Sequence, residues 1–281
     1  MYADSNSSRP TPTVVHVIPK GEIVCGVTSL GNDVFVARYN SQQKIEVYDA
    51  KTFTLQRHIA VHGLGVTFGI AACPNNNCLY ASDSDNASVH RVELSASNAV
   101  MKWSVARYPV GLSVNGEHNL IVVSHNERKL QIFTTRGTLL QDIQLRVDME
   151  GPWHAVQLPT GQFLVSLSGL LDRICLVGVD GAVVRSYGGW KGSKLTQLHE
   201  PRGLAVDRGR VLVADVGNNR LLVMDQSLSS AHEMSASVDT DLQGPRSLWY
   251  DQSSRRLCVG EMYGGRVIVV DNLNNFSTQN K

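Results

Sequence analysis

The sequence lacks the features that define several classes of protein. None of the apolar runs in its 281 residues approaches the length of a membrane span. Residues 1–12 have no apolar core of the kind found in a secretory signal. The formal net charge is only +1, so the overall charge favours neither nucleic acid nor a membrane surface. We therefore expect no membrane association.

Cysteine is also scarce. The chain has five cysteines, an odd number, spread from Cys25 to Cys258, and most of them fall in apolar segments. This predicts buried, reduced thiols and a cytoplasmic protein rather than a disulfide framework. Cys73 and Cys78 stand close together, but without a second pair they give no zinc-binding pattern. The chain also has no Cys/His array of the RING or B-box kind and no coiled-coil heptads.

Residues 201–225 form the stretch around which the rest is organised. Apolar segments at 203–206, 211–214 and 221–224 are separated by Arg208-Gly209 and Gly217-Asn218-Asn219, whose residues favour tight turns. A sheet of this size is not stable alone and needs neighbours of its own kind. Residues 244–271 repeat the pattern in the same order, which indicates a chain built from such units.

The unit recurs along the whole chain. The residues aligned with Asp215 follow one another at intervals of 45, 41, 43, 48 and 46, and they are Arg38, Asp83, Ser124, Leu167, Asp215 and Glu261. Each unit shows four predicted strands, except that the sixth has only three. A strand predicted at 13–18 supplies the missing one if it pairs with 266–271. The sequence thus predicts an all-β fold, a closed six-bladed β-propeller with four-stranded antiparallel blades.

This architecture makes one domain of residues 13–271. We expect residues 1–12, rich in Ser and Pro, to form a flexible N-terminal tail. Residues 272–281 are expected to form a polar C-terminal tail.

The repeat also has a known counterpart. Residues 201–225 follow the form Pro-x-Gly-φ-x-φ-Asp, then φ-φ-Val-x-Asp, then Gly-Asn-x-Arg-φ-x-φ-φ, where φ is apolar. In this pattern the chain resembles NHL-repeat β-propellers, such as those that end the tripartite-motif ubiquitin ligases. The match is looser over the rest of residues 13–271. The resemblance implies a propeller that binds RNA or protein, often as the substrate-selecting part of a ubiquitin ligase.

Acidic residues of the second strands and basic residues at the start of the third strands recur from unit to unit. The acids are Asp83, Asp215 and Glu261, and the basic residues are Lys44, Lys129, Arg173, Arg220 and Arg266, with Ser88 as the exception. A residue repeated in blade after blade serves the blade rather than one ligand. We therefore predict that these residues form structural pairs.

The inner strands bear on whether the protein is an enzyme. They open with Cys25-Gly26, Phe68-Gly69, Val110-Gly111, Trp153-His154, Arg202-Gly203 and Arg246-Ser247. These residues include no Asp, Glu or Asn for a hard cation, and only His154 suits zinc. No spacing indicates a nucleophilic triad or a glycine loop for a dinucleotide. We expect no catalysis, metal or cofactor, and the alternative is a six-bladed hydrolase or lyase with a central metal.

The loops on one rim break the regularity of the repeats. Loops that enter the inner strands and loops that join second to third strands share a face of a propeller. Aromatic and basic residues gather there: Arg38, Tyr39, His62, Arg107, Tyr108, His125, Arg128, Trp153, His154, Trp190, Lys191, Arg202, Arg246 and Tyr263. Such a mixture suits single-stranded nucleic acid or a peptide. Acids dilute the positive charge: Asp83, Asp85, Glu127, Glu150, Asp172 and Glu200.

These patterns lead to one functional prediction. We expect a monomeric, non-catalytic recognition propeller that binds a protein partner or single-stranded RNA through this rim. Residues 75–77 and 252–254 of the opposite face lie on short hairpin tips and are expected to be inert. The resemblance is compatible both with a propeller that stands alone and with the end of a longer ubiquitin ligase.

Overall fold

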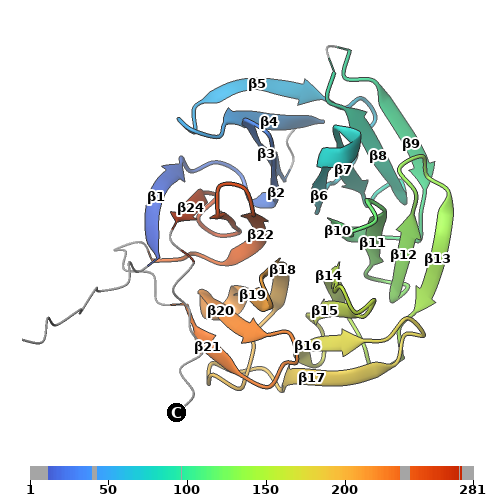
Figure 1. Ribbon diagram of the computed structural model, residues 1–281, viewed down its shortest axis with the longest axis vertical. Helices are drawn as coiled ribbons and strands as arrows, with labels where there is room; N and C mark the ends of the chain where they lie inside the picture. Colours follow the sequence, from blue (N-terminus) through green and yellow to red (C-terminus); the bar gives the residue numbers. More distant parts are fainter. Residues whose placement is uncertain (1–11, 40–42, 96, 235–240, 272, 274–281) are drawn as a thin grey trace, which may run out of the picture.

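The computed structural model describes residues 12–39, 43–95, 97–234, 241–271 and 273. Six four-stranded sheets stand as blades around a central channel, and the first strand of each blade lies beside the channel (Figure 1). The six-bladed propeller predicted from the repeats is therefore confirmed. The predicted tails at 1–12 and 272–281 lie almost wholly outside the described residues. In the part of the chain that is described, no helix is long and apolar enough to span a membrane.

The first three blades follow the chain from the inner strand outward. Blade 1 consists of β2 (Val24–Leu30), β3 (Asp33–Arg38), β4 (Lys44–Asp49) and β5 (Leu55–Ala60). Blade 2 consists of β6 (Ile70–Cys73), β7 (Cys78–Asp83), β8 (Ser88–Glu93) and β9 (Val100–Ser104), with the 3-10 turn η1 (Pro74–Asn76) after β6. Blade 3 consists of β10 (Pro109–Val114), β11 (Leu120–Ser124), β12 (Lys129–Phe133) and β13 (Leu139–Gln144).

The remaining blades follow the same order until the last. Blade 4 consists of β14 (Pro152–Gln157), β15 (Phe163–Leu167), β16 (Asp172–Val177) and β17 (Val183–Gly189). Blade 5 consists of β18 (Pro201–Asp207), β19 (Arg210–Asp215), β20 (Arg220–Asp225) and the short β21 (Ala231–Glu233), with η2 (Val216–Asn218) after β19. Blade 6 consists of β22 (Pro245–Asp251), β23 (Arg256–Glu261), β24 (Val267–Asp271) and β1 (Thr13–Ile18).

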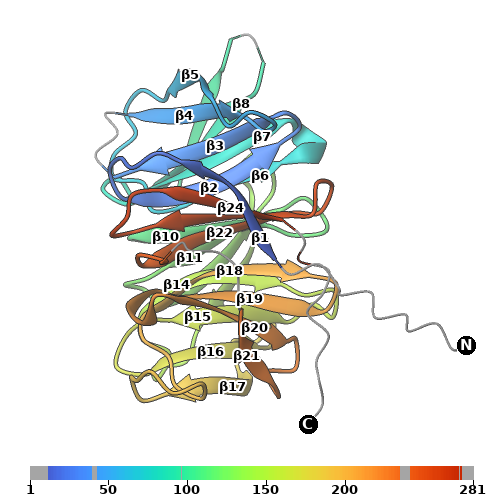
Figure 2. The same cartoon turned by 90° about the vertical axis from the view of Figure 1, so that its left-hand side faces the viewer.

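The ring closes through β1, as the strand count predicts. β1 runs antiparallel to β24, from Thr13 opposite Asp271 to Ile18 opposite Val267 (Figure 2). Ile18 packs in one buried cluster with Val267 and Val269. Closure therefore satisfies the edge of β24 and covers its apolar side chains at the same time.

The core lies between neighbouring blades rather than within one. The second strands β11 and β15 are buried along their whole length, which explains why their sequences are apolar without alternation. The fourth strands β5 and β13 are largely exposed. All five cysteines are buried with free thiols, as the sequence predicts.

The acid and base pairs of the repeat hold loops as well as each other. Arg220 Nε donates to Asp215 Oδ2 at 2.8 Å, and its other nitrogens donate to carbonyls of the loop at 193–197. Arg266 donates twice to Glu261, at 2.6 and 2.8 Å. In blade 2, where the basic position is Ser88, Asp83 contacts His90 Nε2 at 2.9 Å instead.

Candidate functional site

Each blade contributes one residue to a narrow collar at the rim end of the channel. We call this collar the channel neck, and its residues are Cys25, Phe68, Val110, Trp153, Arg202 and Arg246. In five blades the register between the first and second strands shifts at or beside this residue. Such bulges re-aim side chains, and here they occur where the inner strands meet the rim.

The residue after the neck decides how closely the blades approach. A Cβ on Gly69 would lie 2.4 Å from the Val110 carbonyl oxygen, and one on Gly111 would lie 2.3 Å from that of Trp153. Glycine is therefore required where adjacent inner strands nearly touch. At the same position blades 4 and 6 have His154 and Ser247.

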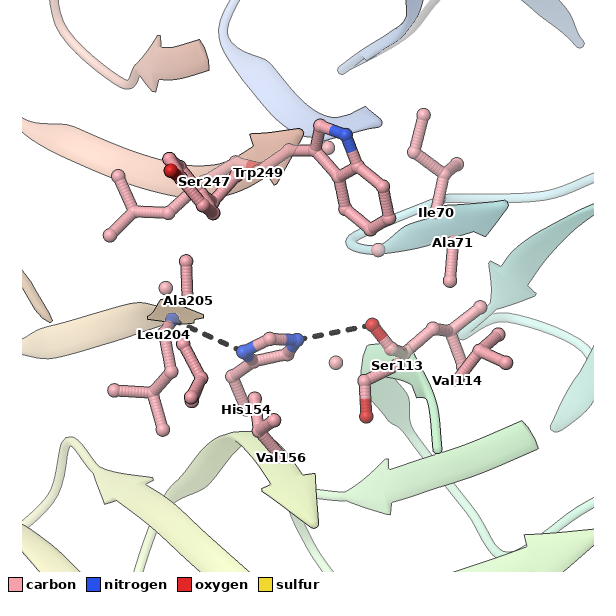
Figure 3. A pocket seen from close by; sticks show the side chains of 18 of the residues that line it. Ile70, Ala71, Ser113, Val114, His154, Val156, Leu204, Ala205, Ser247 and Trp249 are labelled. Atoms are coloured by element: carbon pink, nitrogen blue, oxygen red, sulfur yellow. Dashed lines mark hydrogen bonds between the residues drawn. The ribbon is translucent and has the colours of Figure 1, made fainter. Parts of the chain in front are cut away.

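His154 links three blades through its ring. The Leu204 N–H donates to Nδ1 at 3.1 Å, so Nε2 carries the proton and donates to the Leu112 carbonyl at 3.1 Å (Figure 3). Burial lowers the pKa of this imidazole below its usual value. Because both nitrogens are engaged, His154 holds β10, β14 and β18 together inside the channel instead of facing the rim. Ser247 acts likewise and accepts the Val27 N–H at 2.9 Å.

Aromatic rings of the neck and the rim form one cluster around Phe68. The Phe68 ring lies 5.7 Å from that of Tyr108, 5.8 Å from that of Trp153 and 6.5 Å from that of Tyr39. His125 joins Tyr108 and Trp153 with centroid distances of 5.8 Å. Phe68 was missing from the residues predicted for the rim, although it precedes Gly69 where Trp153 precedes His154.

Two arginines cover these rings. The Arg202 guanidinium carbon lies 4.3 Å from the Trp153 ring centroid, and that of Arg246 lies 5.2 Å from Trp153 and 5.3 Å from Phe68. Arg202 also donates to Glu200 at 3.1 Å. The two guanidiniums and the rings come from blades on opposite sides of the channel, so the cluster covers its rim end.

The other predicted rim residues have different surroundings. Arg38 is buried, pairs with Glu46 at 2.7 Å and donates to the carbonyls of Glu22 and Gly265, so it fastens blade 1 to blade 6. Tyr263 packs over Gly244 near Arg202. Arg107 is exposed, Arg128 is half-buried, and Lys191 is exposed in the loop before β18.

Apolar side chains add a patch at the rim of blade 4. We call it the apolar rim patch, made of Val147, Leu170, Trp190 and Leu195, all exposed. The loops that carry it contact one another: the Ser168 N–H donates to the Gly151 carbonyl, and the Glu200 N–H donates to Asp172. Only Trp190 of this patch was among the predicted site residues, because an isolated exposed Leu or Val carries no signal in a sequence.

Metal-binding chemistry finds few suitable groups here. Among the described residues, no three His, Cys, Asp or Glu side chains are placed to hold a metal ion. At the neck, burial raises the pKa of the Cys25 thiol, although the charges of Arg246 and Arg202 oppose this effect.

Sequence comparison identifies the repeat. Residues 198–224 match the NHL repeat. Protein brain tumor of Drosophila melanogaster is 28% identical over 138 residues, covering 46% of this chain and 12% of that protein. The chain thus carries an NHL repeat and spans a small part of the length of this relative.

Solved structures share the fold at low identity. A streptogramin B lyase has a TM-score of 0.66 at 9% identity, covering 92% of this chain and 96% of that chain. The PQQ-bound aldose sugar dehydrogenase of Streptomyces coelicolor has a TM-score of 0.68 at 14% identity, covering 93% and 98%. A hydrazine synthase chain of Kuenenia stuttgartiensis has a TM-score of 0.66 at 14% identity, covering 96% and 99%. Identities this low show the fold alone.

Proposed function

We propose that this chain is a non-catalytic recognition propeller that binds a protein partner through its rim. The apolar rim patch is the observation that carries the proposal. Trp190 is 72% exposed and Leu170 is 69% exposed, and both lie beside the aromatic and arginine cluster of the neck. Exposed apolar side chains next to Tyr, Trp and Arg have the composition of a protein-binding surface.

The charges of the rim also favour protein. Glu200 neutralises Arg202, and Glu127 accepts the backbone N–H of Arg107 at 2.8 Å. Phosphate binding depends on cationic groups that are free to replace counterions, so paired arginines weaken it.

Single-stranded RNA is the second candidate. Tyr108 is 37% exposed beside Phe68, and the Arg202 guanidinium is stacked on Trp153. Exposed aromatic faces and arginine planes are what bases stack on.

The absence of catalysis is part of the proposal. Its support is that His154 uses both ring nitrogens between Leu204 and Leu112, so the neck has no free general base. We further propose that the propeller works as a monomer in the cytoplasm, where buried free thiols are the rule. Within a longer protein, it would select substrates for a ubiquitin ligase.

The proposal is tested by capture from cell lysate with matched variants. Leu170→Ser combined with Trp190→Ser removes the centre of the apolar rim patch. Val179→Ser is the control, because Val179 is 57% exposed in the same blade but on the opposite face. We expect the rim variant to lose a protein that the wild type and the control retain, with unchanged melting and no effect of ribonuclease. Binding that ribonuclease and moderate salt abolish would select RNA, and equal capture by all three proteins would refute the proposal.

A further inference from the structure

A cavity of about 340 Å³ runs along the channel beneath the neck. Its walls are mostly apolar and include Ile70, Val114, Leu204 and Trp249 (Figure 3). This volume lies at the lower end of the range typical of small-molecule sites, roughly 300–1,000 Å³. The cavity is therefore large enough for a small ligand with an apolar body.

The cavity has one charged end. Arg246 is the one arginine, lysine or carboxylate among the described residues that line it. Its residue is only 3% exposed, and Nε and Nη2 have no hydrogen-bond partner in the described part of the chain. Its neighbours are the rings of Phe68 and Trp153, the Cys25 thiol and the like charge of Arg202.

A buried guanidinium in this state is costly. Removing a charge from water without a paired acid destabilises a protein by several kcal/mol per ion, as a rough guide. Buried polar groups without partners are rare and mark places where an ion or ligand binds. The Nε and Nη2 atoms form the side of arginine that matches the two oxygens of a carboxylate.

We propose that the channel binds a small carboxylate with an apolar body, whose head group pairs with Arg246 and whose body lies between the inner strands. This site is distinct from the rim that binds the protein partner. The cation selects an anion, and the apolar walls select against a fully hydrated one such as inorganic phosphate.

The ligand enters from the face opposite the rim. The aromatic rings and the two arginines cover the rim end of the channel. At the other end the cavity is lined by Asn115, Gly116, Pro159 and Gln252, from the turns that join first to second strands. Gly116 is exposed, and a Cβ there would meet no heavy atom within 4 Å, so a side chain can be added at this entrance without a clash.

The test uses hexanoate as the probe, with hexan-1-ol and hexylammonium as probes of matched size and different charge. Binding is measured by isothermal titration calorimetry. We expect hexanoate to bind about ten- to hundredfold more tightly than hexan-1-ol, because a charge-assisted hydrogen bond contributes this much. Hexylammonium should not bind detectably.

Two variants assign the binding to this cavity. Arg246→Gln should weaken hexanoate about ten- to hundredfold and leave hexan-1-ol unchanged. Gly116→Trp should block both probes, whereas Glu117→Trp, next to it in the same turn but outside the lining, should block neither. If Arg246→Gln does not fold, the Gly116 and Glu117 pair still decides the matter.

The outcomes separate this site from the rim. Leu170→Ser with Trp190→Ser should bind hexanoate normally, and Gly116→Trp should still capture the rim partner. Equal affinity for hexanoate and hexan-1-ol, no binding of hexanoate, or full binding by Gly116→Trp would each overturn the proposal.

Discussion

Arg202 and Trp153 belong to neighbouring blades, and the guanidinium carbon of Arg202 lies 4.3 Å from the Trp153 ring centroid. The same ring lies 5.2 Å from the guanidinium carbon of Arg246 and packs against the core between blades 3 and 4. Trp153 is therefore part of the fold as well as part of the rim.

The first prediction follows from this double contact. Trp153→Ala should lower the free energy of unfolding by about 3 kcal/mol, because it removes a half-buried ring and the stacking surface of two arginines. Trp190→Ala should stay within about 0.5 kcal/mol, since Trp190 is mostly exposed. Urea denaturation measures both, and equal losses would show that Trp153 does not support the neck.

The second prediction concerns the repeat pair of blade 5. Asp215→Ala should cost about 3–5 kcal/mol, because it leaves the buried Arg220 charge without its acid and loosens the loop at 193–197. Asp33→Ala should cost less than about 1 kcal/mol, because the Asp33–Arg57 pair is exposed. Capture of the rim partner at a temperature where both variants are folded should be unchanged. A stable Asp215→Ala protein that has lost its partner would make Asp215 a binding residue.

The third prediction concerns ring closure. Deletion of residues 1–18 removes β1 and exposes the edge of β24 together with Val267 and Val269. We expect aggregation or a large fall in melting temperature. A chain that starts at Pro12 keeps β1 and serves as the control. If both deletions melt like the intact protein, β1 does not close the ring.

The fourth prediction concerns pH. Burial lowers the folded-state pKa of His154 below the unfolded value of about 6.5. The unfolded chain therefore binds more protons as the pH falls, so this stabilisation is complete above about pH 6.5 and is lost below it. We expect the urea midpoint to fall from pH 7.5 to pH 5, and His154→Gln to show a smaller fall from a lower starting value. His62→Gln replaces an exposed histidine and should keep the wild-type slope. An unchanged slope in His154→Gln would contradict the role assigned to its ring.

The sequence predicts the fold well because each blade carries the same signals. The apolar second strands and the turn at Gly217-Asn218-Asn219 are local features, and the missing strand of the sixth unit identifies Thr13–Ile18 as its partner.

The site is harder to predict because it depends on contacts between blades. His154 was expected on the rim, and it lies in the channel because it occupies the position where other blades have glycine. Arg38 was expected to bind a ligand, yet its donors reach Glu22, Glu46 and Gly265. Phe68 carries no polar group and gives no signal, although the cluster is centred on it. None of these contacts joins residues that are close in sequence, apart from Arg38 and Glu46.

Exposed apolar residues also occur away from the rim. Leu139 and Leu140 lie on β13, and Val184 lies on β17, at the outside of the ring. A partner could in principle use this outer side, so the position of contact has to be measured directly.

The most direct test of the recognition rim is site-specific photo-crosslinking in cell lysate. A benzoylphenylalanine is placed at Trp190 on the rim, at Ser253 on the opposite face, or at Leu140 on the outer side. We predict one protein adduct from position 190 that survives ribonuclease and disappears when Leu170→Ser is added, with no matching adduct from positions 253 and 140. Adducts from position 253 or 140 instead of position 190 would contradict the assignment of the rim as the binding surface.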